Sequence, residues 1–243
     1  MQLLAVLAAI LVGALLKGIT GMGLPPIVLP VLAGVVGAQE AVIILAVPTS
    51  VTNAWLAWRH RAHASGTRNL KPILVSGAAG SLLGAWLLTS MDDRLLSVLL
   101  ATIVLVYAAV VLRRPEASLS PTAIRSTAAP VGLVAGALQG ATGLSGPVLA
   151  TYLHAFRLRP PAYVLSISLL FGVFGAVQAV GLIALGRLTG RLALEGLAAT
   201  AVAMAVLPVG VRLGTRLSRR EFDRVVLAVL VLSSVKLLVD ALA

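Results

Sequence analysis

The chain has 243 residues, of which 59% are hydrophobic and 11% are charged, and its formal net charge is +11. A soluble domain could not cover so much apolar surface with polar groups. We therefore interpret the chain as an all-α polytopic membrane protein with about six to eight spans and no soluble domain. Because the basic residues lie in short loops between apolar segments, the positive charge is typical of membrane topology and argues against nucleic acid as a partner.

Ten apolar segments follow one another along the chain, and four of them are too short to cross a bilayer alone. These four form two pairs, and as helices of ~10 to 14 residues they reach about 15 to 21 Å against a hydrocarbon core of ~30 Å. In order, the segments are Leu3 to Leu16, Pro26 to Val36, Ala41 to Trp58, Pro72 to Ser90, Leu95 to Leu112, Ala128 to Leu138, Pro147 to Phe156, Tyr163 to Leu185, Leu192 to Val211, and Phe222 to Leu242.

Each short pair flanks a glycine-rich interruption, and the two interruptions share a sequence pattern. The first lies in GALLKGITGMGLPPIVLP, residues 13–30, and the second in GALQGATGLSGPVL, residues 136–149. So many glycines and prolines do not allow a regular helix to continue, so both stretches predict a broken helix. The aligned positions are Lys17 with Gln139, Gly18 with Gly140, Thr20 with Thr142, Gly21 with Gly143, and Pro25 with Pro147.

The charge of the loops decides between two topologies for the short pairs. If each pair crosses the membrane once, the two sides receive 9 and 8 basic loop residues, whereas if each pair is a hairpin they receive 14 and 3. Only the second distribution gives the cytoplasmic excess of Lys and Arg that inserted proteins show. We therefore expect two broken helical hairpins, with both termini outside.

The duplication extends beyond the breaks. Gly80-x-x-x-Gly84 followed by Asp93-Arg94 is echoed by Gly210-x-x-x-Gly214 followed by Asp223-Arg224. We expect a first repeat at 1–115, with its hairpin at 3–36, then a cytoplasmic linker at 116–127, and a second repeat at 128–243, with its hairpin at 128–156. Each hairpin would be followed by three spans, which turns the second repeat upside down in the manner of many secondary transporters. Parallel four-span repeats without a hairpin are the alternative.

We expect the two breaks to face each other and to enclose a substrate site near the bilayer midplane. Non-helical backbone survives inside a bilayer only where it is buried or lines a cavity. The helix that starts after each break offers N–H groups and the positive end of its dipole, which attract anions. Lys17 adds a cation where hydrocarbon should exclude one, and Asn53, in a polar patch with Thr49, lies in the next span.

The candidate substrate-binding residues are Lys17, Gly18, Thr20, Gly21, Gly23, Pro25, Asn53, Gln139, Gly140, Thr142, Gly143, Ser145, Gly146 and Pro147. Gln178 and Tyr152 are weaker candidates. The sequence does not tell whether Asn53 and Gln178 line the cavity, because the rotation of a broadly apolar helix cannot be read from its period.

Acidic residues are few, and all eight lie at or near predicted span boundaries. This pattern argues against cation pumping, a metal site and carboxylate acid–base chemistry, which need paired or clustered acids. The chain also has no cysteine and no Gly-x-x-x-x-Gly-Lys-Ser/Thr loop for ATP. We expect no enzymatic activity, and therefore no catalytic residues, cofactor or metal.

At its two breaks the sequence resembles the TauE/SafE family of sulfite-exporter-like permeases. The resemblance is carried by Gly18-x-Thr20-Gly21-x-Gly23 with Pro30, and by Gly140-x-Thr142-Gly143-x-Ser145-Gly146-Pro147. The chain departs from the family at Leu24-Pro25-Pro26, where members typically have a denser glycine run. The resemblance implies secondary transport of small sulfur-containing anions, such as sulfite or organosulfonates, across the bacterial inner membrane.

The leading hypothesis is a multi-pass transporter that works by alternating access, with a small anion and the lipid bilayer as its partners. An anion-selective channel and a non-transporting membrane subunit are the alternatives. Proton coupling and a potential-driven uniporter are both open, as is assembly into a homo-oligomer. The sequence identifies neither the anion nor the direction of transport.

Overall fold

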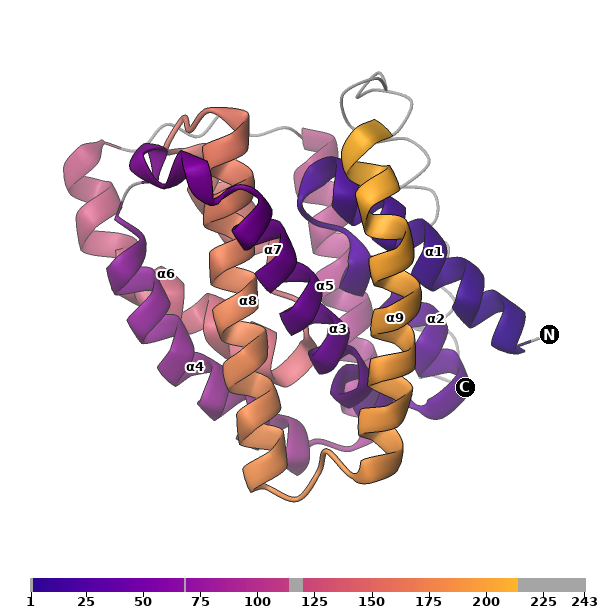
Figure 1. Cartoon of the computed structure of the whole chain (residues 1–243). Coiled ribbons are helices and arrows are strands. Elements are labelled where there is room, and N and C mark those ends of the chain that lie inside the picture. Colours follow the sequence, from indigo (N-terminus) through magenta and orange to yellow (C-terminus); the bar gives the residue numbers. More distant parts are fainter. Residues whose placement is uncertain (1, 68, 114–119, 214–243) are drawn as a thin grey trace.

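The computed structural model describes residues 2–67, 69–113 and 120–213, and within them it contains helices and no β-strand. Five of these helices are long and apolar enough to cross a membrane: Gln2–Ile19, Ala38–Arg59, Leu70–Ser90, Pro160–Ala184 and Gly190–Leu213. The prediction of an all-α polytopic membrane protein is confirmed. Figure 1 shows one bundle, with α1 near the N-terminus at one edge and α4 and α6 at the other.

The helices follow the predicted segments with small shifts at their ends. They are α1 (Gln2–Thr20), α2 (Leu24–Val36), α3 (Ala38–Arg59), the short 3₁₀ helix η1 (Arg61–Gly66), α4 (Leu70–Ser90), α5 (Asp93–Arg113), α6 (Pro121–Thr142), α7 (Gly146–His154), α8 (Pro160–Ala184) and α9 (Gly190–Leu213). The predicted final span, Phe222 to Leu242, lies outside the described residues, as does Gly214.

The start of α6 differs most from the expectation. The helix begins at Pro121, seven residues before the predicted Ala128, so 121–127 of the expected linker 116–127 are helical. The cause is local: the Ser120 hydroxyl accepts a hydrogen bond from the Ala123 N–H at 3.1 Å, and proline follows at the first helical position. The division of the chain into two repeats stays a prediction.

In the first break, the chain reverses direction between α1 and α2. Gly21 and Gly23 have φ values of 78° and 127°, which are strained for residues with a side chain. A Cβ built on Gly13 would lie 3.1 Å from Val28 Cγ2 and 3.2 Å from the Leu24 carbonyl oxygen. Since Gly13 and Val28 would be far apart in a continuous helix, these contacts show that α2 packs back against α1.

The second break has the same shape with a shorter returning helix. Gly143 ends α6 in the left-handed region, at φ 70°, and its N–H donates to the Gln139 carbonyl at 2.8 Å. The Tyr152 hydroxyl in α7 donates to the Ile124 carbonyl and lies 3.1 Å from Thr127 Oγ1. Because Ile124 and Thr127 lie near the start of α6, α7 also returns along the helix that precedes it. Tyr152 therefore closes the second hairpin.

Glycines hold each hairpin against a helix far away in the sequence. A Cβ on Gly18 would lie 2.5 Å from the Leu207 carbonyl oxygen in α9, and one on Gly140 would lie 2.1 Å from the Ser81 carbonyl oxygen in α4. The contacted atoms occupy the same positions relative to Gly210 and to Gly84, so these two glycines are equivalent in packing. The sequence alignment paired Gly210 with Gly80, which is one helical turn away.

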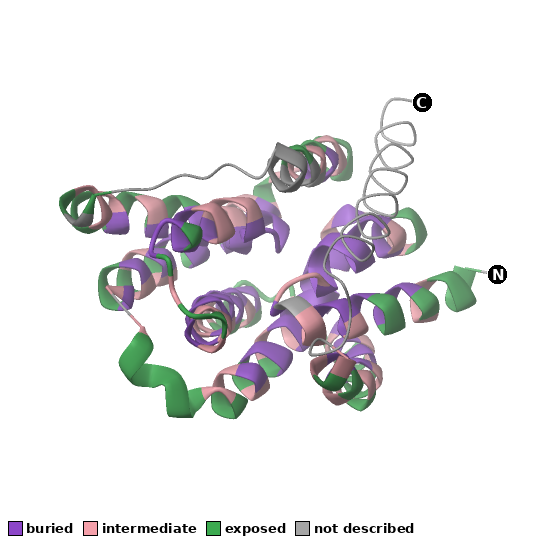
Figure 2. Ribbon diagram, turned by 90° about the horizontal axis from the view of Figure 1, so that it is seen from above, coloured by how far each residue is buried: buried purple, intermediate pink, exposed green. Residues whose placement is uncertain are grey.

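Two full-length helices, α3 and α8, cross at the centre of the bundle. Gly172 packs near Asn53 and Gly175 near Ser50, so the two helices run antiparallel. Buried residues lie on the helix sides that face one another, and exposed ones lie on the outer sides (Figure 2). The outer sides carry large apolar residues such as Val75 and Val180, as a lipid-facing surface requires.

Candidate functional site

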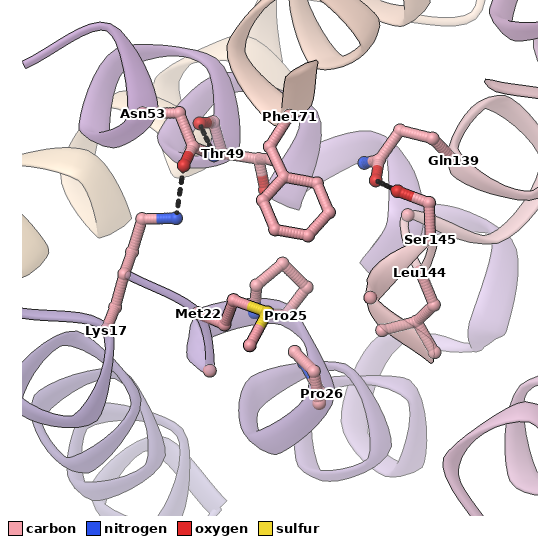
Figure 3. A pocket seen from close by; sticks show the side chains of 13 residues that line it. Lys17, Met22, Pro25, Pro26, Thr49, Asn53, Gln139, Leu144, Ser145 and Phe171 are labelled. Carbon is pink, nitrogen blue, oxygen red and sulfur yellow. Dashed lines mark hydrogen bonds between the residues drawn. The ribbon is translucent and has the colours of Figure 1, made fainter. Parts of the chain in front are cut away.

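A small cavity lies where the two breaks meet α3 and α8. Its volume is about 20 Å³, slightly more than the roughly 10–15 Å³ that one water molecule needs. Residues of both breaks contribute to its wall (Figure 3). The lining residues are Lys17, Met22, Gly23, Pro25, Pro26, Thr49, Asn53, Gln139, Gly143, Leu144, Ser145, Gly146 and Phe171.

Lys17 lies in the last turn of α1, and its side chain is 1% exposed. Its ammonium group donates a hydrogen bond to Asn53 Oδ1 at 2.9 Å. The oxygen of the Asn53 amide faces Lys17 because its Nδ2 donates a hydrogen bond to the Thr49 carbonyl at 2.8 Å. The Lys17 ammonium is therefore bound by a neutral amide, and the orientation of that amide is fixed by a hydrogen bond within α3.

No carboxylate balances this cation within the part of the chain that the structure describes. Lys17 is the only charged side chain among the buried residues there, and no described Asp or Glu is buried. An ammonium group without a countercharge is costly inside a protein, by several kcal/mol even after relaxation. The cavity is thus electropositive.

Gln139 occupies the position in α6 that corresponds to Lys17 in α1. Its Oε1 accepts a hydrogen bond from the Ser145 hydroxyl at 2.8 Å, while its Nε2 has no hydrogen-bond partner although the residue is 1% exposed. A buried donor left without an acceptor costs about 1–3 kcal/mol. The cavity wall therefore carries one orphan donor besides the buried cation.

The two polar pairs belong to different breaks and are separated by an aromatic ring. In Figure 3 the Phe171 side chain from α8 lies between the Lys17–Asn53 pair and the Gln139–Ser145 pair, with Met22 and Pro25 nearby. Arranged in this way, the cavity offers hydrogen-bond donors from both sides and apolar surface between them. Such a wall can bind a small anion by its polar atoms.

Eight of the fourteen predicted site residues line this cavity: Lys17, Gly23, Pro25, Asn53, Gln139, Gly143, Ser145 and Gly146. Their role in substrate binding stays a prediction, as it does for the others. The side chain of Thr20 lies outside the described ones.

The other five candidates lie near the breaks without lining the cavity. Gly18 and Gly140 pack against backbone of α9 and α4. Gly21 forms the first turn, and Pro147 lies half-buried in the first turn of α7. The Thr142 hydroxyl donates to the Leu138 carbonyl at 2.7 Å and accepts from the Leu144 N–H at 3.2 Å, so it supports the break from within.

Gln178 is a structural residue in this arrangement. Its Nε2 donates to the Gly140 carbonyl at 3.0 Å, which ties α8 to the last turn of α6, and it is absent from the cavity wall. Asn53, by contrast, lines the cavity. The structure thus separates two residues whose positions the sequence could not distinguish.

Five lining residues were missed as site residues: Met22, Pro26, Thr49, Leu144 and Phe171. Met22 and Leu144 are the variable positions inside the two glycine patterns, and Pro26 adjoins the first, so proximity to the breaks could have indicated them. Thr49 shares a helix face with Asn53, four residues on. Phe171 carried no signal, because α8 is apolar on most sides.

No group of three or more His, Asp or Glu that could hold a metal occurs in the described ranges.

Comparisons with known proteins address the family to which the chain belongs. Curated proteins and solved structures gave no match. The sequence model of the family described as sulfite exporter TauE/SafE matches residues 5–237, which is nearly the whole chain. The resemblance found at the two glycine patterns is thereby confirmed. The chain belongs to the sulfite exporter TauE/SafE family, and so to a family of membrane transporters.

Proposed function

We propose that the chain is a secondary transporter of small sulfur-containing anions, sulfite above all, and that the anion binds in the cavity between the two breaks. The observation that carries this proposal is Lys17, a buried cation with no buried carboxylate among the described residues to balance it. A bound anion would supply the missing countercharge. Intramembrane charges of this kind usually mark a substrate pathway.

The other polar groups of the cavity wall are suited to bind an oxyanion. The unpartnered Nε2 of Gln139 would donate to one anion oxygen while the Lys17 ammonium binds another. Charge-assisted hydrogen bonds are about twice as strong as neutral ones. At about 20 Å³ the cavity suits a small inorganic oxyanion better than an aryl sulfonate, and it would have to open for either to enter.

Reciprocal packing supports alternating access by an inverted repeat. The first hairpin packs on α9 and the second on α4, α3 packs on α9 and α8 on α4, and α3 crosses α8 antiparallel. Helices α4 and α6 run parallel, because Gly132 packs near Ile73 and Gly140 near Ala85. These directions match those of a second half that lies upside down. Rocking of one half on the other would then expose the cavity to either side.

Polar contacts at one end of the bundle join the proposed halves. Arg191 in α9 pairs with Glu40 in α3 at 2.6 Å, and Arg187 donates to Gln39 at 2.5 Å. In the predicted topology this end faces outward, in a bacterial inner membrane. Exposed pairs of this kind contribute little stability, so they can break during each transport cycle.

Flux into proteoliposomes tests the proposal. Lys17→Gln should reduce sulfite uptake to background, because the anion loses its counterion. The control is Lys71→Gln, an exposed lysine at the start of α4, which should leave uptake unchanged. Sulfite uptake by Lys17→Gln at the rate of the Lys71→Gln control would overturn the site. Counterflow exchange, in which internal sulfite accelerates uptake of labelled sulfite, separates a transporter from a channel.

A further inference from the structure

We propose that the cavity is matched to anions that carry one negative charge, so that the chain moves bisulfite or a monovalent sulfonate in preference to the sulfite dianion or sulfate. This inference rests on the proposed function and specifies its substrate. It follows from the number of charges in the cavity and from the orientation of the helix ends around it.

The first step concerns the side chains. Among the polar residues that line the cavity, Lys17 is the one whose side chain can carry a full charge, whereas Asn53, Thr49, Gln139 and Ser145 are neutral. Lys17 and Gln139 occupy corresponding positions in the two hairpins, so this position has an ionisable side chain in the first hairpin and a neutral one in the second. The side chains of the wall present a single positive charge.

The second step concerns the helix dipoles. A helix N-terminus carries about half a positive charge, and two of them would seem to prepare the cavity for a dianion. In each break, however, the C-terminus of one helix lies beside the N-terminus of the next: α1 ends at Thr20 where α2 begins at Leu24, and α6 ends at Thr142 where α7 begins at Gly146. The two opposite half-charges largely cancel at each tip.

Prolines further reduce what the helix N-termini can donate. Pro25 and Pro26 occupy the first turn of α2, and Pro147 occupies the first turn of α7, so these turns lack the corresponding N–H groups. The fixed charge that an anion meets therefore comes mainly from Lys17.

The third step compares the two kinds of anion. A monoanion beside the Lys17 ammonium leaves the buried site neutral, whereas a dianion leaves one uncompensated negative charge inside the protein. Because an uncompensated buried charge is costly, we expect the monoanion to be favoured by about tenfold or more. Transport of bisulfite would also carry one proton on the substrate, without a titrating carboxylate in the protein.

The test uses two sulfur oxyanions of similar size and different charge. Initial rates of methanesulfonate and sulfate uptake are measured in proteoliposomes with the membrane potential clamped at zero. We expect methanesulfonate to exceed sulfate by about tenfold or more, and sulfite uptake to follow the bisulfite fraction as the pH is changed. Sulfate uptake at an equal or higher rate overturns the inference alone. Absence of flux for methanesulfonate, sulfate and sulfite overturns the proposed function, and the inference with it.

Charge relocation gives an independent test in the same assay. Gln139→Lys places a second cation at the corresponding tip and should shift the ratio toward sulfate, whereas the neutral control Gln139→Met should not. The double variant Lys17→Gln with Gln139→Lys restores a single charge and should restore the preference for methanesulfonate over sulfate. Folding of each variant is checked by size-exclusion chromatography. If a variant does not fold, the wild-type ratio still decides the question.

Discussion

The two breaks share a backbone plan and differ in chemistry. At each, a glycine with positive φ follows the last residue of a helix, a second helix packs back along the first, and a glycine in the preceding helix lies against the backbone of a distant helix. Yet the first break presents an ammonium group bound to Asn53 in α3, and the second presents an amide bound to Ser145 within its own turn. The two breaks are thus similar in their packing and differ in the polar side chains that they present to the cavity.

Removing the amide that holds the cation should have the largest effect on stability. In Asn53→Leu, Lys17 loses its hydrogen-bond acceptor and remains buried, which costs about 3 kcal/mol or more for a charged donor. Lys17→Met combined with Asn53→Leu removes the charge and its partner together, and should recover that loss or exceed it. Thermal unfolding midpoints in detergent would show the order: the double variant above the single one. The opposite order would mean that burying Lys17 does not destabilise the protein.

The packing glycines should show the similarity of the two breaks. Gly18→Val and Gly140→Val each place side-chain atoms against backbone that a Cβ alone would approach within 2.5 Å and 2.1 Å. Overpacking of this kind costs about 1–3 kcal/mol or more, and we expect comparable losses at both sites. Gly190→Val is the control, because a Cβ there meets nothing within 4 Å. Normal unfolding midpoints for either of the first two variants would contradict the described packing.

Sequence alone predicted the breaks because their residues contradict their surroundings. Glycines, prolines and a lysine in an apolar run have few structural explanations inside a bilayer, so the helix ends at Thr20 and Thr142 fall where the pattern indicated. The role of each glycine was not readable in the same way. Gly18, Gly21 and Gly23 serve packing, turning and cavity lining respectively, and only the neighbouring helices distinguish these roles.

Helix rotation explains most of what the sequence could not predict in the site. Phe171 and Gln178 lie on the same apolar helix, and only the first reaches the cavity. A helix that is apolar on most sides has no polar face from which its orientation could be inferred. The early start of α6 was readable in principle, since Ser120 followed by Pro121 is a recognised helix start.

Phe171 offers a way to change the size limit without changing the charge of either break. Its ring fills the space between the two polar pairs, so Phe171→Leu should enlarge the cavity while keeping an apolar wall. We expect uptake of benzenesulfonate to rise relative to sulfite by about tenfold or more, since a change of one methylene in an apolar pocket already alters discrimination by about tenfold or more. The measurement is competition of each anion against labelled sulfite. An unchanged ratio would show that Phe171 does not limit substrate size.

The smallest effect belongs to the neutral pair. Ser145→Ala removes the hydroxyl that donates to Gln139 Oε1, and the loss of one neutral hydrogen bond costs about 1 kcal/mol. That is well below the cost expected for Asn53→Leu, because no charge is left without a partner. The free Gln139 amide should also lose its orientation, which would weaken sulfite uptake without altering the preference for a monoanion, since Lys17 is intact. Ser76→Ala, an analogous loss of a hydroxyl in α4 away from the cavity, is the matched control. If Ser145→Ala lowered the stability as much as Asn53→Leu, the two breaks would contribute equally to the electrostatics of the site. The proposal that the charge of the anion is balanced by the first break alone would then be wrong.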